Sequence, residues 1–129
     1  MFSHIVLGAD DLDGAKSFFD TTLGALGISP SRTGENGRLV YAHGGGLLMI
    51  TRPIDGKPAS CANGGTVGFQ AASPGAVDAW HAAGVAAGGT SCENPPGIRE
   101  SGFGKLYLAY LRDPSGNKLC AAHRFAAAA

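Results

Sequence analysis

The chain has 129 residues, enough to bury one shared hydrophobic core but not two independent ones. Ten basic residues balance ten acidic ones without a block of either sign, so neither nucleic acid nor an anionic membrane surface is an expected partner. No apolar run reaches the roughly 18–20 residues that cross a bilayer, and the N-terminus lacks the basic start and apolar stretch of a signal peptide, so we expect a cytoplasmic protein without membrane contact.

The first part of the chain predicts a strand over 2–7, a helix over 12–26, and two hairpin strands over 39–43 and 47–51. Asp10 or Asp11 supplies an N-cap for the helix, and Gly27 ends it. A polar turn covers 29–37, and the hairpin strands flank Gly44-Gly45-Gly46. The prolines and glycine of 52–63 predict a linker.

The second part predicts a strand over 66–71, a helix from Pro74, an extended segment over 90–93, and strands over 106–111 and 118–123. Ser73 is the expected cap of the helix, whose apolar stripe consists of Val77, Trp80, His81 and Val85. The turn Asp113–Asn117 joins the last two strands, and 126–129 is a featureless tail.

The two parts repeat one plan. The segment from His4 to Phe18 runs from a short strand into a helix, and so does the segment from Thr66 to Trp80, which begins 62 residues later. We therefore expect an α+β fold with two tandem strand-helix-strands (βαβββ) modules at about 1–52 and 65–124, within a single domain over 1–129.

This pattern resembles the vicinal oxygen chelate superfamily, which includes glyoxalase I, bleomycin-resistance proteins and extradiol dioxygenases. The resemblance rests on the doubled plan, on Arg112-Asp-Pro-Ser-Gly-Asn117 before the last strand, and on His4 followed by Ala9-Asp-Asp-Leu12. It implies two curved sheets that form a half-barrel around a central cup, usually in a homodimer, with some members building the cup from two chains.

Strand alternation predicts which side chains face the cup. His4 and Val6 face it if Ile5 packs on the helix, and Thr66 and Gln70 face it by the same parity. Tyr107 and Tyr110 lie on opposite faces of their strand, and parity does not say which one reaches the cup. The residues expected to contact a substrate are Val6, Met49, Thr66, Gln70, Arg99, Tyr110 and Cys120.

Arg99 lies in the glycine-bounded segment 97–104, which we expect to be a loop over the cup. In that position its guanidinium would pair with a substrate carboxylate or phosphate. The alternative is an arginine exposed to solvent.

The resemblance also implies metal ligands on the first and last strands of each module. Those positions hold His4, Met49, Thr66 and Cys120, of which only His4 is a standard ligand, although Cys120 would bind zinc as a thiolate. The odd cysteine count and the absence of a Cys-x-x-Cys pair argue against a disulfide framework or a structural zinc site. We therefore expect no cofactor, with His4 and Cys120 as weak candidates for a divalent metal.

Two functions follow from the resemblance. The first is a glyoxalase-like binding protein that holds a small ligand in the cup without the usual metal ligands. The alternative is a metal-dependent lyase similar to lactoylglutathione lyase, or an extradiol-type dioxygenase, in which His4 is the catalytic candidate as ligand or general acid/base. His43, beside the glycines of the hairpin, is expected to be solvated, with a role as mobile acid or base as the alternative.

Overall fold

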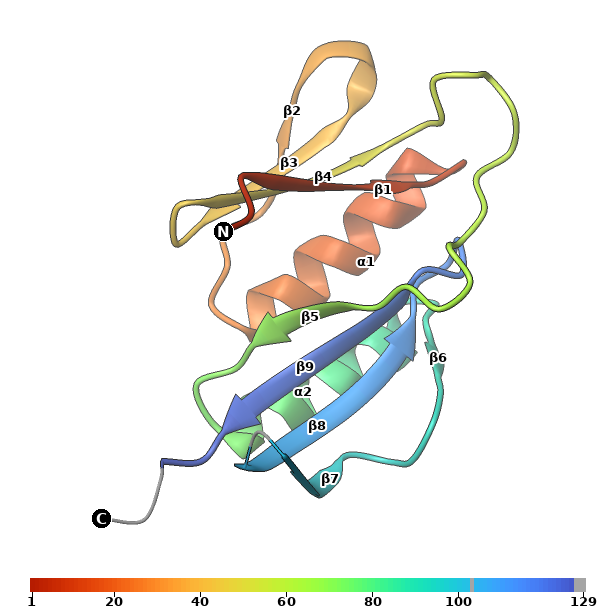
Figure 1. Ribbon diagram of the computed structural model, residues 1–129. Helices are drawn as coiled ribbons and strands as arrows, with labels where there is room; N and C mark the ends of the chain where they lie inside the picture. The colour runs from red at the N-terminus through yellow and green to blue at the C-terminus, as the bar shows by residue number, and fades with distance from the viewer. Residues whose placement is uncertain (103, 127–129) are drawn as a thin grey trace.

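The computed structural model describes residues 1–102 and 104–126, in which two helices pack together and each covers one of two mixed sheets (Figure 1). The first module contains β1 (His4–Gly8), α1 (Leu12–Ala25), β2 (Arg32–Thr33), a 3₁₀ turn (Glu35–Gly37), β3 (Leu39–His43) and β4 (Gly46–Thr51). The second contains β5 (Val67–Gln70), α2 (Pro74–Ala86), β6 (Thr90–Ser91), β7 (Gly97–Ser101), β8 (Gly104–Arg112) and β9 (Lys118–Arg124). The predicted α+β class with two strand-helix-strands modules is confirmed, and the described strands form no closed barrel.

The first sheet has the order β1-β4-β3-β2, and α1 lies beneath it (Figure 1). Of the two predicted candidates, Asp10 and Asp11, it is Asp11 that caps α1, by accepting a hydrogen bond from the Gly14 backbone N–H at 3.0 Å. The apolar side of α1, including Phe18, Phe19 and Leu23, is fully buried against the core.

The second sheet has the order β5-β9-β8-β6, with β7 also paired to β8, and α2 lies behind it (Figure 1). Ser73 caps α2 through the Ala76 backbone N–H, and Val77 and Trp80 are fully buried. Placing Val85 on the buried stripe was wrong, because its side chain is 49% exposed. Gly84 is buried in its place and lies against Thr22 of α1, so the two helices approach closely.

Three short strands differ from the predicted elements. β2 lies inside the predicted polar turn, β6 occupies only the start of the extended segment, and β7 replaces much of the expected loop over 97–104. All three lie at sheet edges and lack alternating apolar residues, so they carry little periodic signal. Phe103, within the expected loop, and residues 127–129 of the expected tail lie outside the described residues.

The turn before β9 joins the two modules. Asp113 is buried and accepts hydrogen bonds from the backbone N–H groups of Ser115 and Asn117 and from the Asn117 side chain. The same Asn117 amide group donates to the carbonyl of Gly8, at the end of β1, at 3.0 Å. The family-like turn is therefore also the polar contact that holds the second module against the first.

Among the described residues, neither helix is long and apolar enough to cross a membrane.

Candidate functional site

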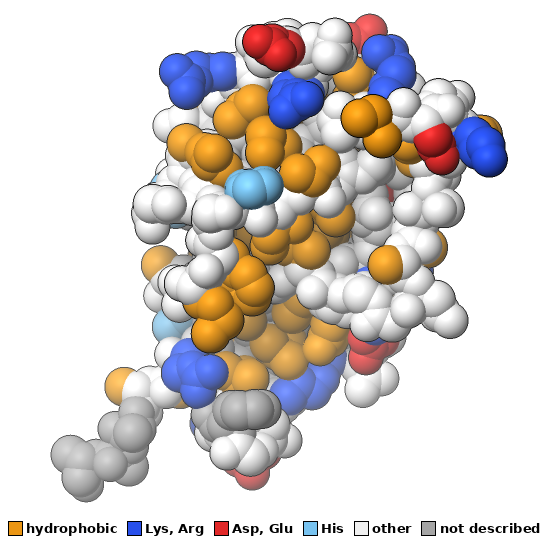
Figure 2. Space-filling model, turned by 45° about the horizontal axis from the view of Figure 1, so that its top comes forward, with side chains coloured by type: hydrophobic (Ala, Val, Ile, Leu, Met, Phe, Trp, Pro, Cys, Tyr) orange, Lys and Arg blue, Asp and Glu red, His pale blue; other side chains and the backbone are white. Residues whose placement is uncertain are grey.

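Each sheet has one face covered by its helix and one face without a helix, which we call its uncovered face. On the first sheet, Leu48 and Ile50 point to α1 and are buried, whereas Val6 and Leu47 point away from it. The side chains of Val6 and Leu47 are 50% and 40% exposed, which is high for large apolar residues of a strand. Apolar side chains form a broad band over the surface shown in Figure 2. A surface of this kind commonly contacts a ligand or another chain.

A hollow of about 670 Å³ lies on the uncovered face of the first sheet, and we call it the first-sheet hollow. Val6 and Met49 are direct neighbours on β1 and β4 and both line it, so the structure brings these two predicted residues together. The lining comes entirely from the first module and the segment after it, and consists of Val6, Gly8, Asn36, Arg38, Met49, Thr51, Arg52, Pro53 and Ile54.

Arg38 is a residue of this hollow that sequence reasoning missed. Its Nε atom is buried and has no hydrogen-bond partner among the described residues, and its Nη1 lies 4.0 Å from the Met49 sulfur. A buried guanidinium N–H without a partner is costly, so it favours a ligand that supplies an acceptor. Strand alternation could have identified Arg38. Val40 is paired with Met49, and residues two apart on a strand face the same side, so Arg38 is expected on the same face as Met49.

The uncovered face of the second sheet carries Tyr110 and Cys120, which are direct neighbours on β8 and β9. Burial raises the pKa of the Cys120 thiol to about 11, so the thiol is protonated at neutral pH, and its Sγ donates to the Ala121 carbonyl at 3.6 Å. Lys118 lies with its Nζ 5.1 Å from the centre of the Tyr110 ring and forms an ion pair with Glu93. Sequence reasoning did not identify this lysine and glutamate as neighbours of the two predicted residues.

The structure settles which tyrosine faces the uncovered side. Tyr107 points to α2, where its hydroxyl donates a hydrogen bond to Asp78 at 2.8 Å. Tyr110 therefore lies on the opposite face, beside Cys120.

The remaining predicted substrate residues do not join either group. Thr66 is exposed just before β5, and Gln70 is exposed at the end of that strand. Arg99 lies on β7 and donates to the carbonyls of Pro95 and Ile98 at 2.8 and 3.2 Å, so its guanidinium is held by backbone groups of its own segment.

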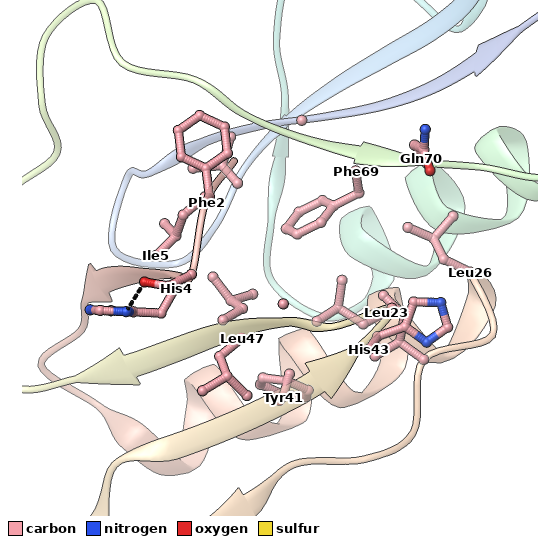
Figure 3. Close-up of a pocket in the computed structure, with 17 residues that line it drawn as sticks. Phe2, His4, Ile5, Leu23, Leu26, Tyr41, His43, Leu47, Phe69 and Gln70 are labelled. Atoms are coloured by element: carbon pink, nitrogen blue, oxygen red, sulfur yellow. Dashed lines mark hydrogen bonds between the residues drawn. The ribbon is translucent and has the colours of Figure 1, made fainter.

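A second cavity, the inter-module cleft, lies between β1 and β5 and has a volume of about 320 Å³ (Figure 3). Its apolar lining comes from both modules and from the end of α1, and its main members are Phe2, Ile5, Leu23, Leu26, Ile28, Leu47, Leu48, Val67 and Phe69. His4 lies at one part of this cleft, with its Nδ1 2.7 Å from the Ser3 hydroxyl. His43 is exposed, as predicted, and lies on the same side of the cleft as Gln70 and Leu26 (Figure 3).

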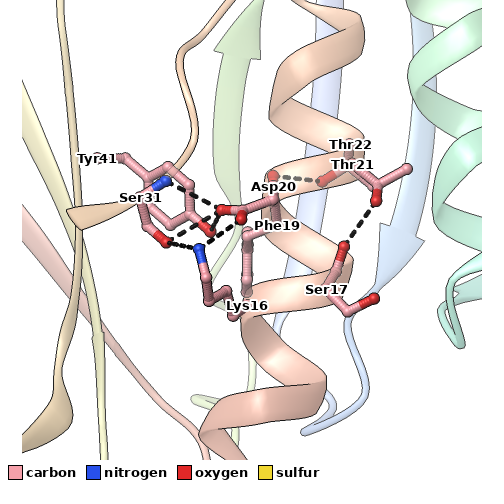
Figure 4. Close-up of polar contacts among 8 residues, drawn as sticks. All are labelled: Lys16, Ser17, Phe19, Asp20, Thr21, Thr22, Ser31 and Tyr41. Carbon is pink, nitrogen blue, oxygen red and sulfur yellow. Dashed lines mark hydrogen bonds and ion pairs between the residues drawn. The ribbon is translucent and has the colours of Figure 1, made fainter. Parts of the chain in front are cut away.

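A polar network surrounds Asp20 of α1 and includes Tyr41, one of the residues that line the cleft (Figure 4). The Tyr41 hydroxyl donates to Asp20 Oδ1 at 2.7 Å, Ser31 donates to the same oxygen from its backbone and hydroxyl groups, and Lys16 pairs with Oδ2 at 2.6 Å. Partial burial alone would raise the pKa of Asp20, but the hydrogen bonds from Lys16, Ser31 and Tyr41 outweigh burial and lower it to about 2. Tyr41 lines the cleft, but its hydroxyl already donates its hydrogen bond to Asp20 and does not donate to a ligand.

This network predicts a specific pH dependence of stability. Since the folded-state pKa of Asp20 is about 2 against an ordinary 3.8, its contribution is complete above about pH 4 and is lost as the pH falls towards 2. Allowing for partial solvent screening, we expect a loss of about 1–2 kcal/mol of unfolding free energy over that range. Urea unfolding at a series of pH values measures it. Asp20→Asn is expected to flatten this part of the profile, and Asp13→Asn, at an exposed position of the same helix, is expected to leave it unchanged. A profile unaffected by Asp20→Asn would contradict the assignment.

The four positions implied as metal ligands do not form a suitable donor set. They offer one imidazole, a thioether, a neutral hydroxyl and a thiol with a raised pKa, and none of them is a carboxylate. Within residues 1–102 and 104–126, no three His, Cys, Asp or Glu side chains are placed to hold one ion. By the usual ligand preferences, these four positions are therefore a poor donor set for a divalent metal.

Comparisons with known proteins agree with this fold. The family model for the Glyoxalase/Bleomycin resistance protein/Dioxygenase superfamily matches residues 1–121. A glyoxalase/bleomycin resistance protein from Albidiferax ferrireducens T118 is 55% identical, with a TM-score of 0.93 over 96% of this chain and 99% of that one. No curated protein matches the sequence.

More distant structures share the fold alone. A glyoxalase-related enzyme from Fulvimarina pelagi is 19% identical, with a TM-score of 0.72 over 96% of this chain and 88% of that one. The lactoylglutathione lyase from Agrobacterium tumefaciens is 23% identical, with a TM-score of 0.65 over 95% of this chain and 92% of that one. The family match over nearly the whole chain, together with the paired modules, leads to one conclusion: the protein belongs to the Glyoxalase/Bleomycin resistance protein/Dioxygenase superfamily.

Proposed function

We propose that this protein binds a small, mostly apolar molecule in the first-sheet hollow without the help of a metal ion. The observation that carries the proposal is the combination of exposed Val6 with the unpartnered Arg38 Nε in one hollow. An apolar surface with one polar anchor is the usual composition of a small-molecule site.

Arg38 and Arg52 define the class of ligand. Both arginines are among the described residues that line the hollow, and none of these residues is acidic. A ligand with an apolar, ring-containing body and one acidic group would place the ring against Val6 and Met49 and the acidic oxygens against Arg38.

Two copies of the chain are proposed to complete the site. The first-sheet hollow contains no residue of the second module, while Tyr110 and Cys120 lie on the uncovered face of the other sheet. Each sheet has its own helix behind it, and the residues that line the hollow all come from the first module and the segment after it, so one chain does not close the two uncovered faces over one ligand (Figure 1). A homodimer that sets the first sheet of one copy against the second sheet of the other would bury Val6 and Leu47.

We propose an activity without a metal because the side chains at the four implied ligand positions are poor metal donors. His4 is the single imidazole among the four implied ligand positions, and Cys120 is held as a neutral thiol beside Tyr110. Metal-dependent lyase or dioxygenase chemistry would require a donor set that these residues do not supply.

The test uses anilinonaphthalene sulfonate, which has apolar rings and one anionic group, as a fluorescent probe. We expect Val6→Asp and Arg38→Met each to weaken probe binding by about tenfold or more, because one removes apolar contact and the other a charged hydrogen bond. Two matched controls are expected to bind as the wild type: Val85→Asp, at a valine of nearly equal exposure on α2, and Arg32→Met, on exposed β2.

Elemental analysis and sedimentation equilibrium complete the test. The expected results are trace metal after purification with zinc, nickel, manganese and iron present, and a dimer in solution. Near-stoichiometric metal would overturn the metal-independent proposal, and a monomer at all concentrations would overturn the two-copy site. Unchanged probe affinity in both Val6→Asp and Arg38→Met would overturn the location of the ligand.

A further inference from the structure

We propose that the inter-module cleft is a second binding site, separate from the first-sheet hollow, for an uncharged amphipathic molecule such as a medium-chain alcohol. Val6, Met49 and Arg38 do not line it, and most of its apolar lining comes from the end of α1 and from side chains of β1 and β5 that point towards the helices, with Leu47 at its edge. Its ligand would therefore lie between the modules and not on an uncovered face.

The cleft exists because two edge strands meet without pairing. β1 is paired only with β4, and β5 only with β9, among the described strands. Ile5 and Phe69 point towards the helices, as buried side chains do, yet both are only half-buried, whereas Leu48 and Leu119 on the neighbouring central strands are buried. The apolar floor is thus accessible through the gap that pairing of β1 with β5 would otherwise close.

Hydrogen-bonding groups lie along the cleft, and none of the described residues that line it is a Lys, Arg, Asp or Glu. The side chains of His43 and Gln70 make no hydrogen bond or ion pair with any other residue of the described part of the chain. Both lie beside Leu26 on one side of the cleft, while Phe2 and Ile5 lie on the other (Figure 3). A hydroxyl or carbonyl group of a ligand is suited to His43 and Gln70, with its hydrocarbon part over Leu26 and Phe69.

Size and polarity restrict the ligand further. A volume of about 320 Å³ is at the lower end of small-molecule sites, which suits a short aliphatic chain or a single ring. Since the lining, among the described residues, holds no Lys, Arg, Asp or Glu, an ionised ligand would lose its hydration without gaining a partner of fixed charge. We therefore expect alcohols to bind in preference to carboxylates of the same length.

The experiment is a titration of the wild-type protein with n-octanol and with n-octanoate, followed by methyl NMR. Octanol is expected to shift the methyl signals of Leu23, Leu26 and Val67 in a saturable manner and to leave those of Val6 unchanged. Octanoate is expected to bind at least about tenfold more weakly. Leu26→Trp, which fills the cleft from a half-exposed position, is expected to abolish the octanol response, and Val67→Phe provides a second filling variant if the first does not fold.

The test of the inter-module cleft can be distinguished from the test of the first-sheet hollow, because each site has its own probe and its own variant. Val6→Asp should remove binding of the sulfonate probe and leave octanol binding unchanged, whereas Leu26→Trp should do the reverse. Octanol shifts centred on Val6 and Met49, equal binding of octanol and octanoate, or full octanol binding by both filling variants would each overturn the proposal.

Discussion

Replacing Asp113 with alanine is expected to lower the free energy of unfolding by about 2–4 kcal/mol. The Asp113 side chain is buried and holds three hydrogen bonds, from the N–H groups of Ser115 and Asn117 at 3.0 and 2.8 Å and from Asn117 Nδ2 at 2.9 Å. Without it, the Asn117 amide group that bonds Gly8 of the first module would lose its orientation. Urea unfolding followed by circular dichroism measures the change.

Asp55 offers a closely matched control. Its carboxylate also accepts a hydrogen bond from the backbone N–H two residues later, at 3.0 Å, but it is exposed in the segment between the modules. Asp55→Ala should therefore change the unfolding free energy by no more than about 0.5 kcal/mol. Equal costs for the two alanine variants would show that Asp113 acts only within its local turn and does not join the modules.

Gly84→Ala is expected to destabilise the protein by about 1–3 kcal/mol, although alanine is the better helix former. A methyl group at position 84 would overlap the Leu111 side chain and lie 3.3 Å from Thr22 Cγ2, and both neighbours are fully buried. These neighbours can move only by disturbing the packed interface between α1, α2 and β8.

Gly24→Ala is the matched control, because Gly24 is also a helical glycine but a methyl group there would meet no atom within 4 Å. That change should stabilise the protein by about 0.5–1 kcal/mol through helix propensity alone. The two substitutions are therefore expected to have opposite signs in thermal unfolding. A stabilising Gly84→Ala would mean that the helices do not approach closely at this point.

The helices, their caps and the longer strands could be predicted because the residues that specify them are close together in the sequence. Both helix caps lie within the predicted choices, Asp11 from the pair Asp10 and Asp11 and Ser73 as named, since a cap depends on a hydrogen bond to a residue three positions later. The same holds for the longer strands, whose alternation separates buried from exposed faces. Val85 was misplaced because Gly84 has no side chain to show its burial in an apolar pattern.

The candidate site could be predicted only in part. Val6 and Met49 were both predicted to contact a substrate and lie side by side in the hollow, but Arg38 was missed because it lies one residue before β3 begins. Parity also could not choose between Tyr107 and Tyr110, which required the contact between Tyr107 and Asp78 on α2. The inter-module cleft depends on how two unpaired strand edges lie relative to each other, and no periodicity in the chain encodes that distance.

The position of β9 has a consequence for how the protein forms during synthesis. β9 is the last strand of the second module but lies between β5 and β8 in the second sheet, so β5 has no partner until β9 arrives, and β8 is paired only with β6 and β7. The first sheet, by contrast, is complete once residue 51 has been made. The first module can therefore assemble on the ribosome, whereas the second sheet stays incomplete until its final strand has emerged. Until then, chaperones or the folded first module must shield the apolar residues of the second module from aggregation.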